Sequence, residues 1–327
     1  MRFPTIDLLR YAVRDSLRKW LDKSGACESG IGIYCYHGLV QKRQDKQLER
    51  NFQSVSDFRE HVQFFRRHGV MTLENLTHPL AQGGGSDRRR AVITFDDGYA
   101  NNLLAAEILA EAKLPWCLFV STAAMGRQKA MWLVELSLLL LHGRCDRLEA
   151  LGQAWQLRER KERENAYKAI RYRLKPMPAN SCRQAMNEIR GQFPASEMER
   201  LLEQFPSLRM MTWEQVKRLS DAGVEIGSHG VEHEIHHPAQ DPEVRRRELV
   251  ESKKEIERQV GKRCRFFAFP NGDYCDHSAQ ELEAAGYELA FTTRPGFIRP
   301  ESNPFLLPRI SPGGSLAKLK HQLSELC

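Results

Sequence analysis

Two adjacent carboxylates, Asp96 and Asp97, belong to the segment 94–98, which directly follows the short apolar run 91–93. The run is typical of a buried strand, so both carboxylates are expected at a strand end, where repulsion is strong and solvation poor. Such a pair is tolerable when a cation neutralises one carboxylate and the other holds or exchanges a proton. His229 and His233 stand four residues apart, also just after an apolar run. One Asp and two His would form a three-ligand site with open positions for water and substrate, which is typical of a catalytic divalent metal.

Non-catalytic interpretations of these residues are weaker. One Asp could cap a helix that begins near Asn101, but capping explains one carboxylate and not both. The two histidines could be incidental, because the segment 229–237 is rich in histidine. Their position after an apolar run and the presence of the Asp pair favour metal binding instead.

The composition fits a folded protein with an anionic partner. The chain has 327 residues, of which 41% are hydrophobic and 28% charged, and a formal net charge of +7. The positive net charge favours an anionic binding partner, such as a polyanionic glycan, a lipid phosphate or a membrane surface. We expect no nucleic-acid binding, because zinc-finger, RRM and helix-turn-helix signatures are missing.

The eight cysteines include no Cys-x-x-Cys pair, which suits reduced thiols. The charged N-terminus lacks the apolar core of a signal peptide, so we expect a cytoplasmic protein, with peripheral contact to the inner face of the membrane as an option.

Short apolar runs alternate with amphipathic helical patterns from residue 31 onward. Strands are predicted over 31–36, 91–95, 115–121, 224–228, 265–270, 288–293 and 306–310. Helices are predicted over 58–68, 103–112, 213–222, 244–260 and 278–285. The alternation indicates an α/β fold with a mainly parallel sheet, closed or nearly closed. Catalytic residues then belong at the carboxyl ends of strands, where both motifs fall.

Two segments depart from this alternation. Residues 5–23, within an N-terminal region 1–25, predict a cationic amphipathic helix. Packing on the protein's own core or on a second subunit is the favoured role of this helix, and binding to an anionic membrane surface is the alternative. Residues 127–210 predict a helical insertion on the active-site side or flank of the sheet. The insertion contains the apolar run 131–141 and the charged run 158–164, which is expected to be a solvated helix face.

Three motifs, in order, carry a resemblance to a known family. Thr94–Gly98 reads T-F-D-D-G, His229–His233 carries two histidines with Gly where Ser or Thr is usual, and Phe267–Gly272 reads F-A-F-P-N-G. In these residues the chain resembles the polysaccharide deacetylase family of the NodB-homology type. The resemblance extends over 31–312 apart from the insertion, and it implies a domain over 26–327 that folds as a distorted (β/α)7 TIM-like barrel. Members of this family hydrolyse N-acetyl, less often O-acetyl, groups on glycans with the help of a divalent metal, commonly zinc.

The resemblance also implies roles for individual residues. Asp97, His229 and His233 would bind the metal, which is expected to be Zn²⁺, with Co²⁺, Ni²⁺ or Mn²⁺ as alternatives. Asp96 would be the general base that takes a proton from the attacking water. A backbone N–H, that of Asn271, would hold the oxyanion that develops on the acetyl group.

Three family elements are missing in their usual form: the C-terminal Leu-x-His motif that carries the general acid, the Arg-x-Pro motif, and a tryptophan-containing motif. The branch that deacetylates poly-N-acetylglucosamine is permuted and has its acid in an N-terminal Tyr-His motif, which this chain matches at Tyr36-His37. His37 is therefore the expected general acid, which protonates the leaving amine. Arg309 and Arg265 are both candidates for orienting the base.

The implied function is a metal-dependent N-deacetylase that acts on an amino sugar of a glycan or of a lipid-linked saccharide intermediate in cell-envelope synthesis. Tyr99 and Tyr274 would line the substrate groove. A lipid-linked substrate fits the cationic N-terminal helix and the apolar run 131–141. A non-catalytic glycan-binding relative is one alternative, but it would have lost its base or a metal ligand. A metal amidohydrolase acting on a small non-sugar amide is the other, and it would need a narrow pocket closed by the insertion.

Overall fold

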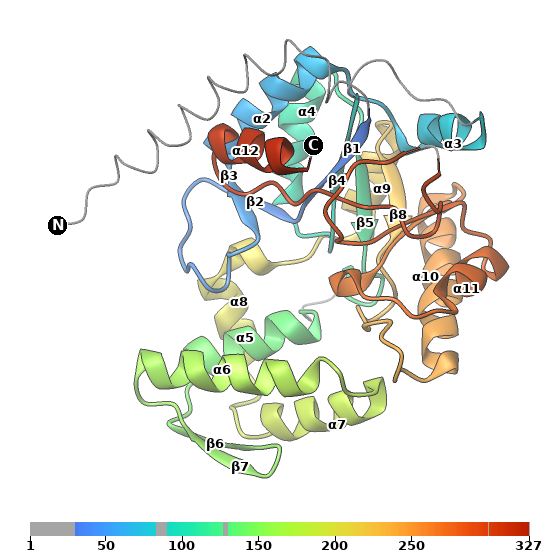
Figure 1. Cartoon of the computed structure of the whole chain (residues 1–327). Coiled ribbons are helices and arrows are strands. Elements are labelled where there is room, and N and C mark those ends of the chain that lie inside the picture. The colour runs from blue at the N-terminus through green and yellow to red at the C-terminus, as the bar shows by residue number, and fades with distance from the viewer. Residues whose placement is uncertain (1–29, 83–89, 127–129, 300, 327) are drawn as a thin grey trace.

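The computed structural model describes residues 30–82, 90–126, 130–299 and 301–326. Within these ranges the chain forms a curled parallel sheet with helices around it and a separate lobe of helices at one end (Figure 1). The cationic helix predicted over 5–23 lies outside the described residues and stays a prediction.

Six parallel strands form the central sheet in the order β1-β4-β5-β8-β9-β10. The strands are β1 (Ile31–Tyr36), β4 (Arg90–Phe95), β5 (Cys117–Val120), β8 (Glu225–Ser228), β9 (Phe266–Ala268) and β10 (Leu289–Phe291). Nearly all of their residues are buried, as expected for strands covered on both faces. Tyr36 of β1 pairs with Phe95 of β4. The residues that follow these two, His37 and Asp96, therefore leave the sheet side by side.

Residues 306–310, predicted as a seventh strand, close the barrel without forming a regular strand. Leu307 bridges to β10 and Ile310 bridges to β1, both in parallel. The N–H of Ile310 donates to the carbonyl of Ile33 at 2.7 Å. Pro308 lies between the two bridges and has no N–H to donate, so a continuous ladder cannot form there. The predicted α/β barrel is confirmed, with six strands and this bridging segment in place of seven strands.

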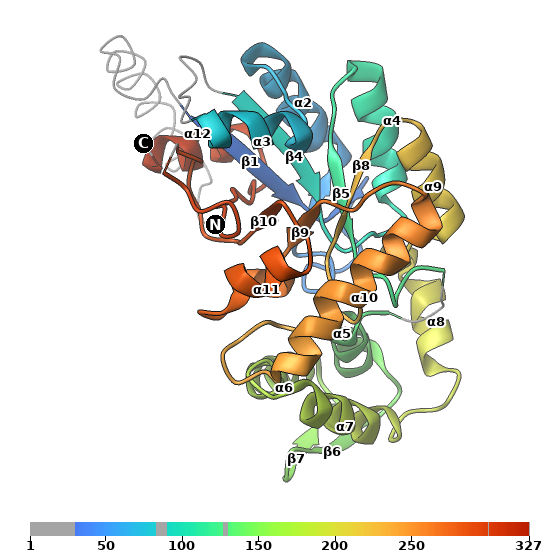
Figure 2. The ribbon, with the colours of Figure 1, turned by 90° about the vertical axis from the view of Figure 1, so that its right-hand side faces the viewer.

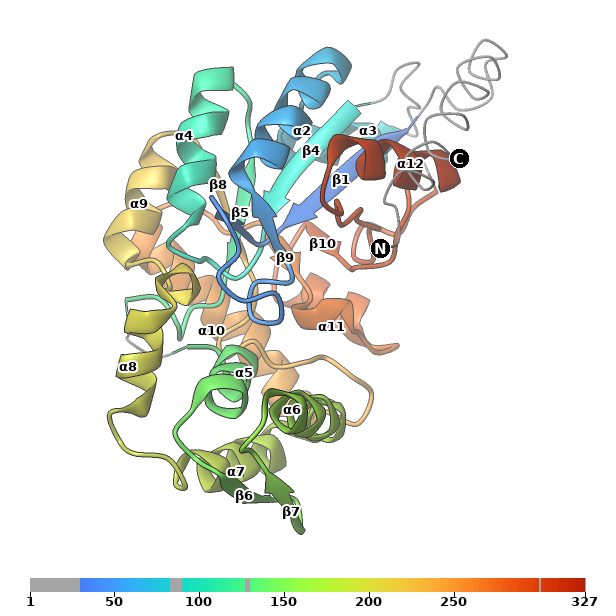
Figure 3. The same cartoon turned by 90° about the vertical axis from the view of Figure 1, so that its left-hand side faces the viewer.

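Helices surround the sheet on its outer side (Figure 2, Figure 3). They are α2 (Val55–His68), α3 (Leu73–Gln82), α4 (Asn102–Ala112), α9 (Trp213–Asp221), α10 (Pro242–Val260), α11 (Ser278–Ala284) and α12 (Leu316–Glu325). In α2, Ser54 caps the first turn by accepting the N–H of Asp57 at 3.1 Å. Val55, Phe58, Val62 and Phe65 then form a buried stripe at helical spacing.

A lobe between β5 and α9 corresponds to the predicted insertion and lies at the end of the barrel toward which β1 and β4 point (Figure 1, Figure 2). Its helices are α5 (Trp132–His142), α6 (Arg160–Leu174), α7 (Ala179–Arg190), α8 (Glu197–Gln204) and the short η2 (Pro206–Leu208). It also holds an antiparallel hairpin of β6 (Arg147–Ala150) and β7 (Gln153–Gln156), which the sequence did not predict. Leu151 and Gly152 form its turn with φ of 55° and 74°. A leucine rarely adopts positive φ, so the turn lacks the usual sequence signal.

Helix α5 corrects the expectation that the apolar run 131–141 could meet lipid. Residues 134–141 are all buried, and the helix packs against α6, α7 and α8 as the core of the lobe. The charged run 158–164 is also more than a solvated face. Arg163 within it donates to the carbonyls of Leu140 at 3.1 Å and Gly143 at 3.0 Å, which satisfies the carboxyl end of α5. No helix in the described ranges is both long enough and apolar enough to cross a membrane.

Candidate active site

The predicted site residues meet at the carboxyl edge of the barrel. Asp96 and Asp97 follow β4, and His229 follows β8. Asp97 has φ 75°, a left-handed backbone that a non-glycine residue holds only when its surroundings impose it. Helix α4 begins at Asn102, with Asn101 in the N-cap position. Neither carboxylate therefore serves as a helix cap.

Asp97, His229 and His233 form a buried cluster of three ligand groups. The Oδ1 atom of Asp97 lies 3.4 Å from Nε2 of His229 and 3.5 Å from Nε2 of His233. The Nδ1 atom of His229 lies 2.7 Å from the carbonyl oxygen of Ala268 and is its hydrogen-bond donor. This bond fixes the tautomer and leaves the Nε2 lone pair directed at the cluster.

The cluster fits a divalent metal. Tetrahedral bonds of about 2.0–2.1 Å separate the ligand atoms by about 3.3–3.4 Å, close to the observed separations. Oδ1 of Asp97 is buried and, among the described residues, accepts no hydrogen bond. A buried carboxylate oxygen without a partner is costly, and a cation would satisfy it. One carboxylate oxygen and two imidazole nitrogens suit Zn²⁺ and other divalent transition metals such as Co²⁺, Ni²⁺ and Mn²⁺.

The two imidazoles also set the charge state of Asp97. Burial by itself would raise the pKa of this carboxyl, but the rings of His229 and His233, when protonated, outweigh burial and hold the pKa well below its usual range. The carboxylate is therefore ionised and available as a ligand.

Asp96 is held by Arg309 through two hydrogen bonds. Nη1 and Nη2 of Arg309 donate to Oδ1 and Oδ2 of Asp96 at 2.8 and 2.7 Å, and Nε donates to the carbonyl of Thr292 at 3.0 Å. Burial would raise the pKa of Asp96, but Arg309 and then His229 hold it at about 2. The thiol of Cys35 donates to Oδ2 of Asp96 at 3.3 Å, a contact that the sequence did not predict. The carboxylate is thus ionised and fixed in orientation.

Arg265, the other candidate for orienting the base, lies elsewhere. Its guanidinium pairs with Glu288 at 2.7 Å and with Glu74 at 2.8 Å. Arg265 precedes β9, so it lies at the amino edge of the sheet, whereas Arg309 lies near the end of the closing segment, at the carboxyl edge. The expectation for Arg265 is therefore wrong, and of the two candidates Arg309 contacts Asp96.

His37 lies beside Asp96 and does not belong to the Asp97–His229–His233 cluster. Cys35, His37 and Asp96 bring one potential ligand atom each within 4.8 Å of one another. His37 is partly buried, and its carbonyl accepts a hydrogen bond from Nδ2 of Asn102 at 2.6 Å. The backbone of His37 is therefore fixed, while its side chain borders the carboxylate.

A buried carboxylate that the sequence analysis missed, Glu248 on α10, holds the loop between His229 and His233. It accepts hydrogen bonds from the N–H groups of Val231 at 2.8 Å, Glu232 at 3.0 Å and Glu234 at 3.3 Å. A Cβ atom at Gly230 would lie 2.6 Å from Oε2 of Glu248, and the φ of this residue is +81°. This close approach accounts for glycine at a position where the family usually has Ser or Thr.

Replacing Glu248 is expected to weaken metal binding without removing a ligand. Glu248→Ala leaves three N–H donors without their acceptor, of which that of Glu234 is buried and those of Val231 and Glu232 are part-buried. An unpaired buried donor costs about 1–3 kcal/mol, so the loop should lose its fixed conformation. We expect the affinity for zinc to fall about 10–100-fold, as for other residues that orient metal ligands. Competition with a zinc chelator measures this affinity. Glu251→Ala, on an exposed position of the same helix, is the matched control and should bind zinc normally. Unchanged zinc affinity in Glu248→Ala would show that the loop does not depend on this carboxylate.

The three residues predicted to contact the substrate, Asn271, Tyr274 and Tyr99, differ in their exposure and in their neighbours. Asn271 has φ 59°, and its side chain contacts Lys175 of the lobe, which brings the lobe to the third motif. Tyr274 is half-buried, with the guanidinium of Arg294 4.8 Å from its ring centroid, and its groove-lining role stays a prediction. Tyr99 is only 5% exposed. We correct the expectation for Tyr99, because its ring has little surface to offer a substrate and packs beside Asp97 instead.

Comparison with protein families agrees with this geometry. The family model described as polysaccharide deacetylase matches residues 83–290, more than half of the chain. The chain belongs to the polysaccharide deacetylase family. The part matched by the family model contains Asp96, Asp97, His229, His233 and Asn271, whereas His37 and Arg309 lie outside it.

Individual relatives of this chain are distant. YxkH of Bacillus subtilis, named as a candidate polysaccharide deacetylase, is 28% identical over 107 residues, which are 32% of this chain and 38% of that protein. The chain thus matches well under half the length of this curated relative. The deacetylase PplD of Streptococcus pyogenes, solved in complex with acetate, is similar in fold with a TM-score of 0.58 and 18% identity, covering 90% of this chain and 99% of PplD. IcaB of Ammonifex degensii has a TM-score of 0.55 and 17% identity, covering 86% of this chain and 91% of IcaB.

Proposed function

We propose that the protein is a metal-dependent N-deacetylase that removes the acetyl group from an N-acetylated sugar unit of a glycan. The observation that carries the proposal is the buried Asp97–His229–His233 cluster directly beside the Asp96–Arg309 pair. A three-ligand metal site activates water, and an ionised, oriented carboxylate next to it can act as the general base, which together allow an amide to be hydrolysed. Membership of the polysaccharide deacetylase family supports a sugar as the carrier of that amide.

Asp97, His229 and His233 would hold the metal. When bound, a divalent cation would polarise the acetyl carbonyl and make water more acidic. Asp96, ionised at neutral pH, accepts a proton from the attacking water while the oxygen of that water bonds to the acetyl carbon. The backbone N–H of Asn271 is the proposed donor to the oxyanion. The C–N bond then breaks, and a donor must protonate the leaving nitrogen so that acetate and a free amine result.

His37 is the proposed proton donor, because it borders Asp96 and is not one of the three clustered ligand residues. Arg309 has the proposed role of orienting Asp96, since its planar guanidinium holds both carboxylate oxygens at once. Neither residue belongs to the predicted ligand set, so each should affect turnover without removing the metal.

The proposal does not extend to a lipid-linked substrate. One of the two features that favoured such a substrate, the apolar run 131–141, is buried in the lobe. The non-catalytic alternative expects a missing base or ligand, whereas Asp96 and the three ligand residues are present and lie together. An amidohydrolase acting on a small non-sugar amide remains a rival.

Acetate release tests the proposal and the role of His37 together. The zinc-loaded protein should release acetate from N-acetylated oligosaccharides, and preferentially over simple acetamides. His37→Ala should retain zinc but lose turnover by about 10²–10⁴-fold, the usual contribution of general acid–base catalysis. His68→Ala is the matched control, because His68 bonds the carbonyl of Phe64 on α2, away from the site. Turnover of acetamides alone would favour the non-sugar rival, and full activity in His37→Ala would remove it from the mechanism.

A further inference from the structure

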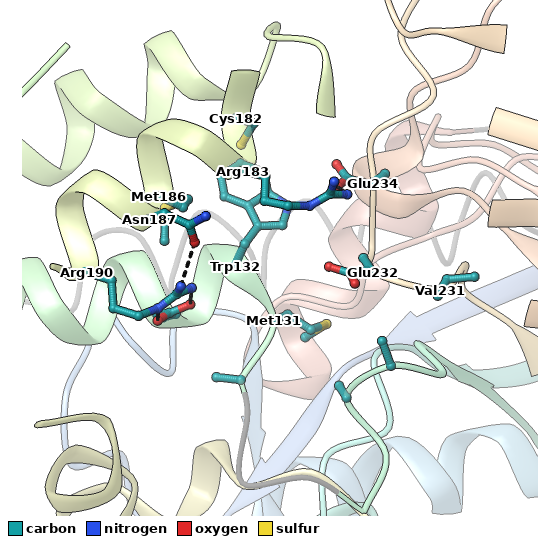
Figure 4. Close-up of a pocket in the computed structure, with 14 residues that line it drawn as sticks. Met131, Trp132, Cys182, Arg183, Met186, Asn187, Arg190, Val231, Glu232 and Glu234 are labelled. Carbon is teal, nitrogen blue, oxygen red and sulfur yellow. Dashed lines mark hydrogen bonds and ion pairs between the residues drawn. The ribbon is translucent and has the colours of Figure 1, made fainter. Parts of the chain in front are cut away.

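A pocket of about 140 Å³ lies between the lobe and the loop that carries the ligand His233. Figure 4 shows its walls: Trp132 at the start of α5, Arg183 on α7, and Glu232 and Glu234 from the metal-site loop. Glu232 and Glu234 immediately flank His233 in the chain. The pocket and the proposed metal centre therefore share one loop, and the N–H groups of Glu232 and Glu234 in this loop donate to Glu248.

Two polar atoms of this pocket make no hydrogen bond to any residue that the structure describes. Within the described part of the chain, Nε1 of Trp132 and Nη2 of Arg183 are buried and make no hydrogen bond. Nη2 of Arg183 lies 3.8 Å from Oε1 of Glu234, too far for a hydrogen bond. Met131 and Met186 add apolar surface to the same pocket. The pocket thus presents two unsatisfied N–H donors, carboxylate acceptors and an apolar wall.

The pocket is too small to enclose a whole ligand and can hold only one substituent of it. Pockets that enclose a whole small molecule usually measure about 300–1,000 Å³, so this one suits a single substituent of a larger molecule. A free ammonium group would satisfy Glu232 and Glu234 but could not accept from Trp132 or Arg183. An acetamido group offers a carbonyl acceptor, an N–H donor and a methyl group, and so meets all three kinds of surface.

We propose that this pocket binds the acetamido group of a second sugar unit in the same glycan, next to the unit that is deacetylated. The inference rests on the proposed function and deepens it, since it makes the substrate an N-acetylated oligosaccharide or polymer rather than a single amino sugar. The carbonyl of the second unit accepts from Trp132 and Arg183, its N–H donates to Glu234, and its methyl group meets Met131 and Met186. The lobe thereby becomes part of the substrate site.

Binding measurements separate this inference from the proposed function. Zinc-loaded protein carrying Asp96→Asn is titrated calorimetrically with β-linked N-acetylglucosamine oligomers of one to four units. The affinity should rise at least about 10-fold once a second acetylated unit is present. Trp132→Phe, which keeps an aromatic ring but removes the N–H donor, should lower that affinity about 3–10-fold, and Arg183→Met by at least as much. Trp155→Phe on β7 is the matched control, because Nε1 of Trp155 is likewise buried and unpaired, and it should change nothing.

Each outcome bears on one claim. An affinity independent of chain length, or one unchanged by Trp132→Phe and Arg183→Met, would overturn the second-unit site while acetate release could still uphold the deacetylase. Equal binding of a dimer whose second unit is deacetylated would also overturn it, because the acetamido group would not be what is recognised. Failure of the protein with intact Asp96 to release acetate from any oligomer would instead refute the proposed function.

Discussion

Asp96→Asn is expected to reduce acetate release by at least about 10³-fold while leaving bound zinc in place. The substitution keeps the size of the side chain and one oxygen that Arg309 can contact, but an amide cannot accept the proton of the attacking water. Asp96 is not among the three clustered ligands, and its Oδ2 lies 4.0 Å from Nε2 of His229. Single-turnover assays together with metal analysis of the same preparation measure both quantities.

The cost of this substitution to folding must be separated from its effect on chemistry. Arg309 is 1% exposed, and breaking a buried ion pair by removing one charge typically costs about 3–5 kcal/mol. Asp45→Asn is the matched control. Asp45 also has a pKa of about 2 and accepts from Arg160 and His142 at 2.9 Å, but it lies outside the site. Asp45→Asn should therefore lose some stability and no turnover. Full turnover in Asp96→Asn with zinc bound would show that another group is the base.

His233→Ala is expected to abolish stoichiometric metal binding and, with it, all acetate release. It removes one of three ligand groups and leaves Asp97 with a single imidazole neighbour at 3.4 Å. The loss of affinity should exceed the roughly 10–100-fold that follows when only the hydrogen-bond partner of a ligand is removed. Elemental analysis after gel filtration, followed by zinc titration, measures this loss.

His237→Ala is the matched control for His233. His237 lies four residues further along, is partly exposed, and has its Nε2 atom 3.1 Å from the carbonyl oxygen of Met177, outside the ligand cluster. This variant should retain zinc and turnover. Normal zinc content in His233→Ala would mean that the metal is bound by other groups.

Much of the site could be predicted because its chemistry is concentrated in short segments at strand ends. Asp96, Asp97 and His229 each follow a buried apolar run, and parallel strands bring their carboxyl ends to one edge of the sheet. The register between β1 and β4 then places His37 beside Asp96. At these positions the local sequence predicts a strand end, and the parallel topology brings the strand ends together. The residues could therefore be assigned to one site without knowledge of any side-chain contact.

The residues that were missed or misplaced depend on contacts that are distant in the chain. Glu248 lies in a charged stretch of α10 and differs from its exposed neighbours only because that face of the helix meets the metal-site loop. Arg265 and Arg309 both border strands, but opposite edges of the sheet give them different partners. An apolar run such as 131–141 is equally compatible with a buried helix and with lipid contact, and the packing of the lobe decides between them.

The most direct test of the account is acetate release from an N-acetylglucosamine oligomer before and after the metal is stripped from the purified protein. We expect about one divalent ion per chain, loss of acetate release on chelation, and recovery in proportion to the zinc restored, with Co²⁺, Ni²⁺ or Mn²⁺ tested in parallel. Undiminished acetate release from metal-free protein, or a protein that binds no divalent metal at the Asp97–His229–His233 cluster, would contradict it.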